Sequence, residues 1–310
     1  MRQEWIEDLL AVLDTGSITA AAERRCLTQS AFTRRLRAVE SALGADLLDR
    51  RGKPARLLPH VAEREREMRS LLVRLNALRN ALNDPAGRTA QRVSIACQHT
   101  IAATISPGLI RELTREGMLN VRVRESDRDG CLMLLLSAAV DFAVIFETPE
   151  EALSEGRRVL LEERIGHDRM IPVVAASYRA RFEAAMANRT LSLIAYPSDV
   201  HFGQLFETRF LAALAPDVAI ERTAETGLAL AALHYTLQGI GIGWLPRSVA
   251  AEEIARGTLL DVSARLPGQD LEVNIVRLER TMSALAEEVW KRIATDYGKR
   301  DSRLPAPARG

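Results

Sequence analysis

Polar side chains suited to hydrogen bonding recur at helical spacing along one short N-terminal stretch. The set combines an amide, two hydroxyls and two guanidiniums: Gln29, Ser30, Thr33, Arg34 and Arg37. Groups of these types bond to base edges and to phosphate oxygens in the major groove of DNA. Because residues three and four apart share a helix face, the spacing predicts a recognition helix that presents all five groups together.

The ends of this helix are also predicted. Thr28 is a suitable N-cap, and Gly44 suits the left-handed conformation in which many helices end. The opposite face should form an apolar stripe, with Phe32 beside it, made of Ala31, Leu36, Val39 and Leu43. An amphipathic helix of this kind packs one face on a core and leaves the polar face open.

Two further helices are predicted before it. Apolar residues recur at helical spacing from Trp5 to Leu13 and stop before Gly16, which suits a helix C-terminus. Ser17 can cap a second helix, in which residues 20–22 are all alanine. Small side chains there would allow another helix to approach closely.

Positive charge is concentrated in the same region. The whole chain of 310 residues has a formal charge of only +1, but nine basic residues face four acidic ones between Thr15 and His60. A basic segment attracts phosphate groups. Arginine is abundant along the whole chain, so a solvated helix face is the alternative interpretation. The placement of the caps, glycines and alanines favours DNA binding.

About sixty N-terminal residues resemble the N-terminal domain of the LysR family of bacterial regulators. The matching residues are Ala20-Ala21-Ala22-Glu23, Thr28-Gln29-Ser30-Ala31-Phe32-Thr33-Arg34, Leu36-Arg37-Ala38-Val39-Glu40 and Leu43-Gly44. The resemblance implies a winged helix-turn-helix in which Gln29, Ser30 and Thr33 face bases. It also implies that Arg34 and the Thr28 hydroxyl hold the DNA backbone. The proline that often follows the glutamine in this family is serine in this chain.

Residues 47–58 resemble the β-wing of the family. Their cations would contact phosphates: Arg50, Arg51, Lys53 and Arg56. The usual threonine-proline-alanine-glycine at the exit of the wing is replaced by Leu58-Pro59-His60-Val61, so the next helix could begin differently.

Apolar residues then step by three and four through a charged stretch. They are Met68, Leu71, Leu75, Leu78 and Leu82. A single helix cannot bury such a seam, so the pattern predicts a dimer that pairs two DNA-binding heads, with packing inside one chain as the alternative. The segment Asp84-Pro85-Ala86-Gly87-Arg88 should break the helix and form a hinge.

The remaining residues alternate between strand and helix patterns. Strands are expected near residues 92–97, 119–125, 141–146, 170–175, 192–195, 218–221, 240–244 and 271–277, and the alternation predicts parallel α/β lobes. A turn over Gln98–Thr100 should precede a helix over 105–115. The order resembles the periplasmic-binding-protein-like effector domain of the LysR family, with Gly239-Ile240-Gly241-Ile242-Gly243-Trp244-Leu245-Pro246 similar to a motif in its second lobe.

Ligands of open α/β sheets bind beyond the carboxyl ends of the strands. The candidates at such positions are Gln98, His99, Thr100, Phe146, Glu147, Tyr196, Ser198, His201, Phe202, Glu225 and Thr226. Thr100 also has support from its position in the family. For the others, an ordinary loop or strand-end role is the alternative.

The sequence therefore predicts an all-α winged helix-turn-helix, a long linker helix and a two-lobed α/β effector domain. We expect a DNA-binding domain over 1–60, a linker and dimerisation helix with its hinge over 61–88, an effector-binding domain over 89–296 and a flexible tail over 297–310. Lobe 1 should span about 89–166 and 267–296, and lobe 2 about 167–266.

Other protein classes fit the sequence less well. The glycine run at 239–243 has Trp244 where a dinucleotide fingerprint needs glycine, and no catalytic constellation is evident. The three cysteines lack metal-ligand spacing, and no cofactor is expected. A solute-binding protein would normally need an export signal, which the N-terminus lacks, and would leave the basic helices unexplained.

The expected function is a cytoplasmic, nucleoid-associated transcription regulator. Its expected partners are double-stranded DNA with a pseudo-palindromic operator, a small-molecule effector, further copies of the chain in a homodimer or homotetramer, and RNA polymerase if it activates transcription. No membrane contact is expected, because no run of eighteen apolar residues occurs. Arg25, residues 31–35 and Gly243-Trp244-Leu245-Pro246 resemble the hypochlorite-responsive subgroup, so an oxidant is an alternative signal.

Overall fold

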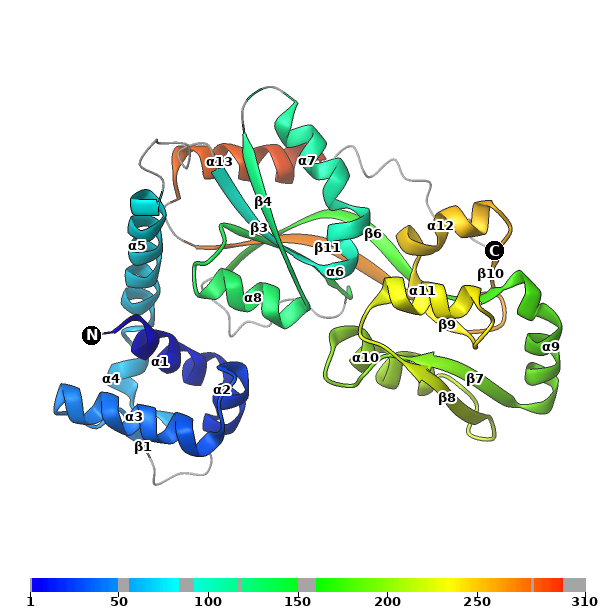
Figure 1. Cartoon of the computed structure of the whole chain (residues 1–310), viewed down its shortest axis with the longest axis horizontal. Helices are drawn as coiled ribbons and strands as arrows, with labels where there is room; N and C mark the ends of the chain where they lie inside the picture. The colour runs from blue at the N-terminus through cyan, green and yellow to red at the C-terminus, as the bar shows by residue number, and fades with distance from the viewer. Residues whose placement is uncertain are drawn as a thin grey trace. The chain divides into compact units, whose positions relative to one another are not determined.

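The computed structural model describes residues 2–49, 56–83, 92–115, 117, 119–149, 160–279 and 282–297. The chain divides into two compact units (Figure 1). The first comprises Met1–Ala90 with the short segment Leu136–Ala139, and the second comprises Gln91–Leu135 with Val140–Gly310. The predicted hinge at 84–88 and all but the first residue of the predicted tail at 297–310 lie outside the described residues.

Three helices build the first unit: α1 (Gln3–Thr15), α2 (Ile18–Arg24) and α3 (Gln29–Leu43). The predicted ends are confirmed. Gly16 and Gly44 take left-handed conformations with φ of 64° and 65°, and the hydroxyl of Ser17 accepts a hydrogen bond from the Ala20 N–H. Ala21 and Ala22 are fully buried, so the alanine run does let the helices pack closely.

A short hairpin and two helices complete this unit. Strands β1 (Leu48–Asp49) and β2 (Arg56–Leu57) pair antiparallel. They lead into α4 (Pro59–Ala62) and then into α5 (Glu65–Asn83). Among the described residues no helix, α5 included, is both long and apolar enough to cross a lipid bilayer.

One large sheet organises the second unit. Its strands are β3 (Arg92–Gln98), β4 (Asn120–Ser126), β5 (Phe142–Glu147), β6 (Leu160–Ala175), β10 (Leu259–Asp261) and β11 (Gln269–Leu278), in the order β10-β6-β11-β5-β3-β4. Strand β9 (Gly243–Pro246) pairs with β6 outside this path. A separate parallel pair joins β7 (Thr190–Ala195) to β8 (Ala219–Glu225).

Helices cover both faces of the large sheet (Figure 1). On one face α6 (His99–Thr104), α7 (Ser106–Thr114) and α13 (Ala284–Lys291) share a core with Val93, Phe142 and Val144. Helix α8 (Arg128–Leu136) covers the other face. A final π-helical turn follows α13 (Arg292–Tyr297).

The second lobe surrounds the β7–β8 pair. Its helices are α9 (Arg179–Asn188), which follows a 3-10 turn (Ala176–Tyr178), then α10 (His201–Leu205), which continues as a π-helix (Phe206–Leu211), α11 (Ala229–Leu237) and α12 (Arg247–Ala255). Trp244, Phe206 and Phe210 form its aromatic core, with ring centroids 5.4 to 5.5 Å from Trp244. The indole N–H of Trp244 donates to the carbonyl of Pro267 at 2.8 Å.

Three sequence predictions for this unit were wrong in detail. The large sheet is mixed, because β6, β9, β10 and β11 pair antiparallel and only β3, β4 and β5 are parallel. The strand expected at 170–175 begins earlier, at Leu160. The prediction missed its first half because apolar and polar residues alternate only weakly there. The turn expected at Gln98–Thr100 is absent, because α6 begins directly at His99.

Candidate nucleic-acid interface and effector site

The inner face of α3 fixes which side chains face outward. Phe32, Leu36 and Val39 are each at most 1 % exposed and join α1 and α2 in one core. The Thr28 hydroxyl caps the helix by accepting a hydrogen bond from the Ala31 N–H at 3.3 Å, as predicted. Leu43, predicted to face inward, is instead 46 % exposed, because it lies in the last turn beyond the core.

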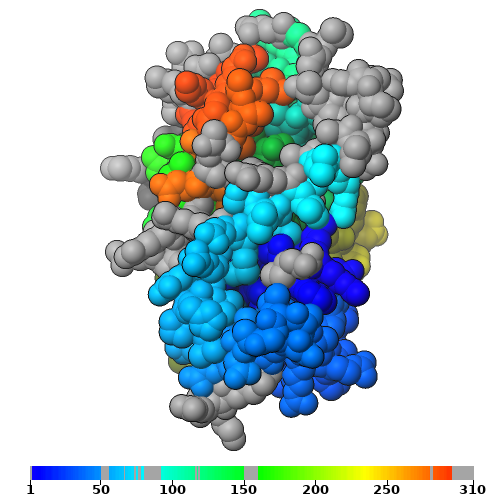
Figure 2. Space-filling model, turned by 90° about the vertical axis from the view of Figure 1, so that its left-hand side faces the viewer, coloured from blue at the N-terminus to red at the C-terminus, as the bar shows by residue number. Residues whose placement is uncertain are grey.

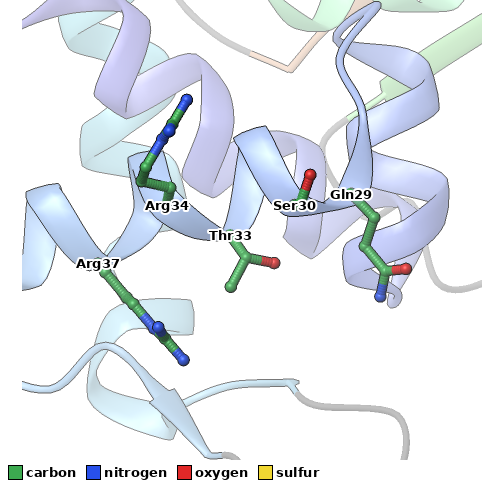
Figure 3. Close-up of a pocket in the computed structure, with 5 residues that line it drawn as sticks. All are labelled: Gln29, Ser30, Thr33, Arg34 and Arg37. Atoms are coloured by element: carbon green, nitrogen blue, oxygen red, sulfur yellow. The ribbon is translucent and has the colours of Figure 1, made fainter.

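The outer face of α3 carries the predicted polar set. An open hollow of about 410 Å³ is lined by Gln29, Ser30, Thr33, Arg34 and Arg37. Figure 3 shows all five side chains projecting from this one helix. Thr33 is half-buried and the other four are exposed. The structure therefore brings together amide, hydroxyl and guanidinium groups within one accessible surface.

A buried carboxylate that sequence reasoning missed holds α3 to its neighbours. Asp8 of α1 has no exposed surface and contacts Arg25 Nε at 2.9 Å and Arg35 Nη2 at 2.8 Å. Burial raises the pKa of Asp8, although both arginines oppose this. Burial also lowers the pKa of Arg25, but the carboxylates of Asp8 and Glu7 more than compensate and raise it.

A second missed residue connects α3 to the wing. The Glu40 side chain is 8 % exposed, and its Oε1 accepts hydrogen bonds from the backbone N–H groups of Leu47 at 3.0 Å and Leu48 at 3.3 Å. Acidic residues on a helix are usually solvated, so the sequence gave little reason to expect that Glu40 is buried. The apolar residues beside Glu40 were the only indication. The contact fixes where the first wing strand begins.

The wing itself is only partly described. Leu48 pairs with Leu57 and Asp49 with Arg56, so a hairpin is present and Arg56 is exposed on it. The other predicted phosphate contacts, Arg50, Arg51 and Lys53, lie outside the described residues.

Helix α5 divides into a buried part and an exposed stripe. Met68 and Leu72 are 6 % and 1 % exposed and pack into the core of the first unit, so Met68 does not belong to the exposed seam. Leu71, Leu75 and Leu78 are 44 to 58 % exposed, and Figure 2 shows α5, in light blue to cyan, open on one face. The Leu82 side chain is not among the side chains that the structure describes.

In the second unit, five of the predicted ligand residues form one chain of contacts. The Gln98 side-chain oxygen at the end of β3 accepts a hydrogen bond from the Phe146 backbone N–H at the end of β5. The Phe202 ring of α10 lies 5.9 Å from Phe146, 5.7 Å from Tyr196 and 5.9 Å from His201. The carboxyl ends of β3 and β5 in the large sheet therefore lie close to residues that follow β7 in the smaller pair.

Most of these residues are buried rather than open. Phe146 and Tyr196 have no exposed surface, and the Tyr196 hydroxyl donates to the carbonyl of Trp244 at 2.9 Å. Burial raises the pKa of Tyr196. Glu147 is 1 % exposed and pairs with Arg128 at 2.5 Å. These contacts stabilise the positions of the residues at the ends of β5 and β7.

The remaining candidates differ in exposure. His99 and Ser198 are exposed, whereas Thr100 is 5 % exposed at the start of α6. Glu225 is exposed at the end of β8, opposite Ala195, and the hydroxyl of Thr226 accepts a hydrogen bond from the Leu228 N–H at 3.2 Å. These residues therefore lie at or just after the carboxyl ends of β3, β7 and β8.

The cysteines are not paired. Cys97 and Cys131 are buried in the second unit, and Cys26 is exposed in the turn before α3. Burial raises the pKa of Cys131 to about 12 and that of Cys97 further. Thiols held neutral in this way react slowly.

Two family models match the chain. The model described as the bacterial regulatory helix-turn-helix protein, lysR family, matches residues 4–60, and the LysR substrate binding domain matches residues 86–297. Among curated proteins, the HTH-type transcriptional regulator YjiE of Escherichia coli is 23 % identical over 290 residues, which are 94 % of this chain and 93 % of YjiE.

Solved structures share the fold. HypT of Salmonella typhimurium, a hypochlorite-specific LysR-type regulator, superposes with a TM-score of 0.59 at 22 % identity, covering 95 % of this chain and 97 % of HypT. DarR of Vibrio fischeri in complex with DNA gives a TM-score of 0.55 at 24 % identity, covering 95 % and 99 %.

Glu40 provides a test of how the wing is held. Replacing it with alanine removes the acceptor of two N–H groups, which should cost about 1–3 kcal/mol locally. In Glu40→Ala, hydrogen exchange at Leu47 and Leu48 should therefore accelerate. Glu40→Gln keeps a side-chain oxygen and should exchange more slowly than the alanine variant. Equal protection in the wild type and in Glu40→Ala would show that the contact is unimportant.

Proposed function

The chain belongs to the LysR family of bacterial transcriptional regulators, which bind DNA and respond to effectors, and we propose that α3 supplies its base-reading surface. The observation that carries this proposal is the accessible set of Gln29, Ser30, Thr33, Arg34 and Arg37 on one face of a capped helix. Gln29, Ser30 and Thr33 face base edges. Arg34, Arg37 and the Thr28 hydroxyl bind the sugar-phosphate chain.

The wing extends this surface along the DNA backbone. Arg56 and the cations at positions 50, 51 and 53 contact phosphates beside the groove that α3 enters. Contacts to phosphate add affinity for any sequence and fix the orientation of the protein, while contacts to bases select the site. In this proposal, residues 1–60 form the DNA-binding domain and residues 61–88 the linker.

The exposed stripe of Leu71, Leu75 and Leu78 pairs with the same stripe of a second copy. Exposed leucines at intervals of four and three suit the seam of two packed helices, and an isologous pair gives a two-fold axis. Two heads related by such an axis match a pseudo-palindromic operator. Whether the assembly is a dimer or a tetramer depends on further contacts.

The effector binds in the second unit, where the ends of β3, β5, β7 and β8 carry the candidate residues. The matching family model describes this region as a substrate binding domain. Thr100 and the start of α6 lie at one end of β3, and His201 and Phe202 follow β7. A small molecule is the signal in this proposal, because residues 86–297 match the model of a substrate binding domain.

This assignment describes a regulator rather than an enzyme, acting in the cytoplasm on the nucleoid. A role in activation would add RNA polymerase as a partner. The test is selection of duplexes from a random pool by the purified oligomer, repeated with metabolite mixtures. Enrichment of one motif, altered by a metabolite, is the expected result. Failure to prefer any duplex at low ionic strength would refute the function.

Substitutions in α3 separate the two kinds of contact. Arg34→Ala should weaken binding to all duplexes and flatten the dependence of affinity on salt, because a phosphate contact is lost. Gln29→Ala should mainly reduce discrimination between the selected site and its single-base variants. Each change should cost about 1–3 kcal/mol, measured by fluorescence anisotropy titration. Unchanged isotherms for both variants would refute the assigned helix.

The exposed stripe can be tested with a charge. Leu75→Glu should weaken self-association at least tenfold, which is about 1.4 kcal/mol, because the glutamate would be buried in the seam. Light scattering of the full chain measures the change in molar mass. Leu43→Glu is the matched control, since Leu43 is similarly exposed but lies on α3. A Leu75→Glu chain with the wild-type mass would place the interface elsewhere.

A further inference from the structure

Asp8 of α1 contacts a recognition-helix arginine as well as the turn before that helix. Its carboxylate is completely buried and lies 2.8 Å from Arg35 and 2.9 Å from Arg25. Glu7 pairs with Arg25 at 2.7 Å, and Glu4 approaches Arg35 at 3.8 Å. The acidic first half of α1 therefore holds two cations that belong to the helix-turn-helix.

The three arginines at positions 34, 35 and 37 of α3 therefore differ in exposure and in ion pairing. Arg34 and Arg37 are exposed and line the hollow of the outer face. Within the described part of the chain neither of them forms an ion pair, whereas Arg35 contacts Asp8 and Glu4. The Arg35 side chain is nevertheless 33 % exposed, although it is not one of the side chains that line the hollow.

We propose that Asp8 is a positioning residue that holds the Arg35 guanidinium away from bound DNA. The proposal rests on DNA binding by α3. An arginine next to Arg34 on this helix would otherwise be available to a phosphate, because its side chain is long and always charged. Asp8 thus limits the number of phosphate contacts that α3 makes.

The consequence of this restraint is greater selectivity. An additional phosphate contact strengthens binding to every sequence and so reduces the ratio of specific to non-specific affinity. A regulator must find few sites among many competing ones, so that ratio matters more than affinity alone. Holding Arg35 back preserves the share of the binding free energy that comes from bases.

Asp8→Asn in the full-length chain tests the idea. The substitution keeps the shape of the side chain but removes the charge that retains Arg35. Affinity for a fluorescein-labelled duplex of arbitrary sequence should rise, and the slope of log affinity against log salt should become steeper by about 0.9 for each chain bound. A simple loss of structure would weaken binding and would not steepen the slope.

Further variants complete the experiment. The double variant Asp8→Asn with Arg35→Gln should return the slope to the wild-type value. Glu7→Gln should leave the slope unchanged, because Glu7 pairs with Arg25 and accepts a hydrogen bond from Gln3, whereas Arg35 pairs with Asp8 and Glu4. If Asp8→Asn does not fold, Arg35→Gln alone decides, since it should bind with the wild-type slope. An unchanged slope in folded Asp8→Asn, or a shallower one in Arg35→Gln, would overturn the proposal. Absence of DNA binding by the wild type would instead refute the proposed function.

Discussion

The structure of the first unit depends on how α3 is fixed in rotation about its own axis. A helix presents a new side chain every 100°, so a rotation of about that size would move core side chains toward the polar outer face. Phe32, Leu36 and Val39 prevent this through packing, and burial of such side chains contributes about 1.5–3 kcal/mol each. Two polar contacts also restrict the rotation of α3: the ion pair of Asp8 with Arg35, and the hydrogen bond that Glu40 accepts from the Leu47 N–H in the wing.

Burying Asp8 is costly, and the cost explains its arrangement. A carboxylate removed from water is tolerated only when cations and hydrogen bonds replace its hydration, and removing one partner of such a pair usually destabilises strongly. Arg25 and Arg35 come from opposite sides of the turn between α2 and α3, so their shared partner links both helices to α1. The arginines on the inner side are thus neutralised by Asp8, whereas Arg34 and Arg37 on the outer face keep their positive charge exposed.

Local sequence features were enough to predict the elements of the first unit and its outer face. Caps, glycines and the apolar stripe determine α3, and the polar set at 29–37 follows from the helical period. The buried ion pairs were not predictable, because Asp8 and Arg35 are 27 positions apart and a charge on a helix is normally solvated. In the second unit, the pattern of β6 and β11 does not reveal their direction, since strand pairing depends on contacts distant in sequence.

Helix α5 offers a physical route from assembly to DNA recognition within the first unit. Met68 and Leu72 lie in the core that supports α3, and Arg69 contacts Asp14 at the end of α1 and Glu65 on its own helix. The first half of α5 is therefore part of the same rigid body as α1, while its exposed leucines lie farther along the helix. In the proposed dimer, a change in how the two α5 helices pair would move the attached helices as one body. The spacing of the two recognition helices would change without any rearrangement of the base-reading surface itself, so regulation and specificity can reside in different contacts of the same chain.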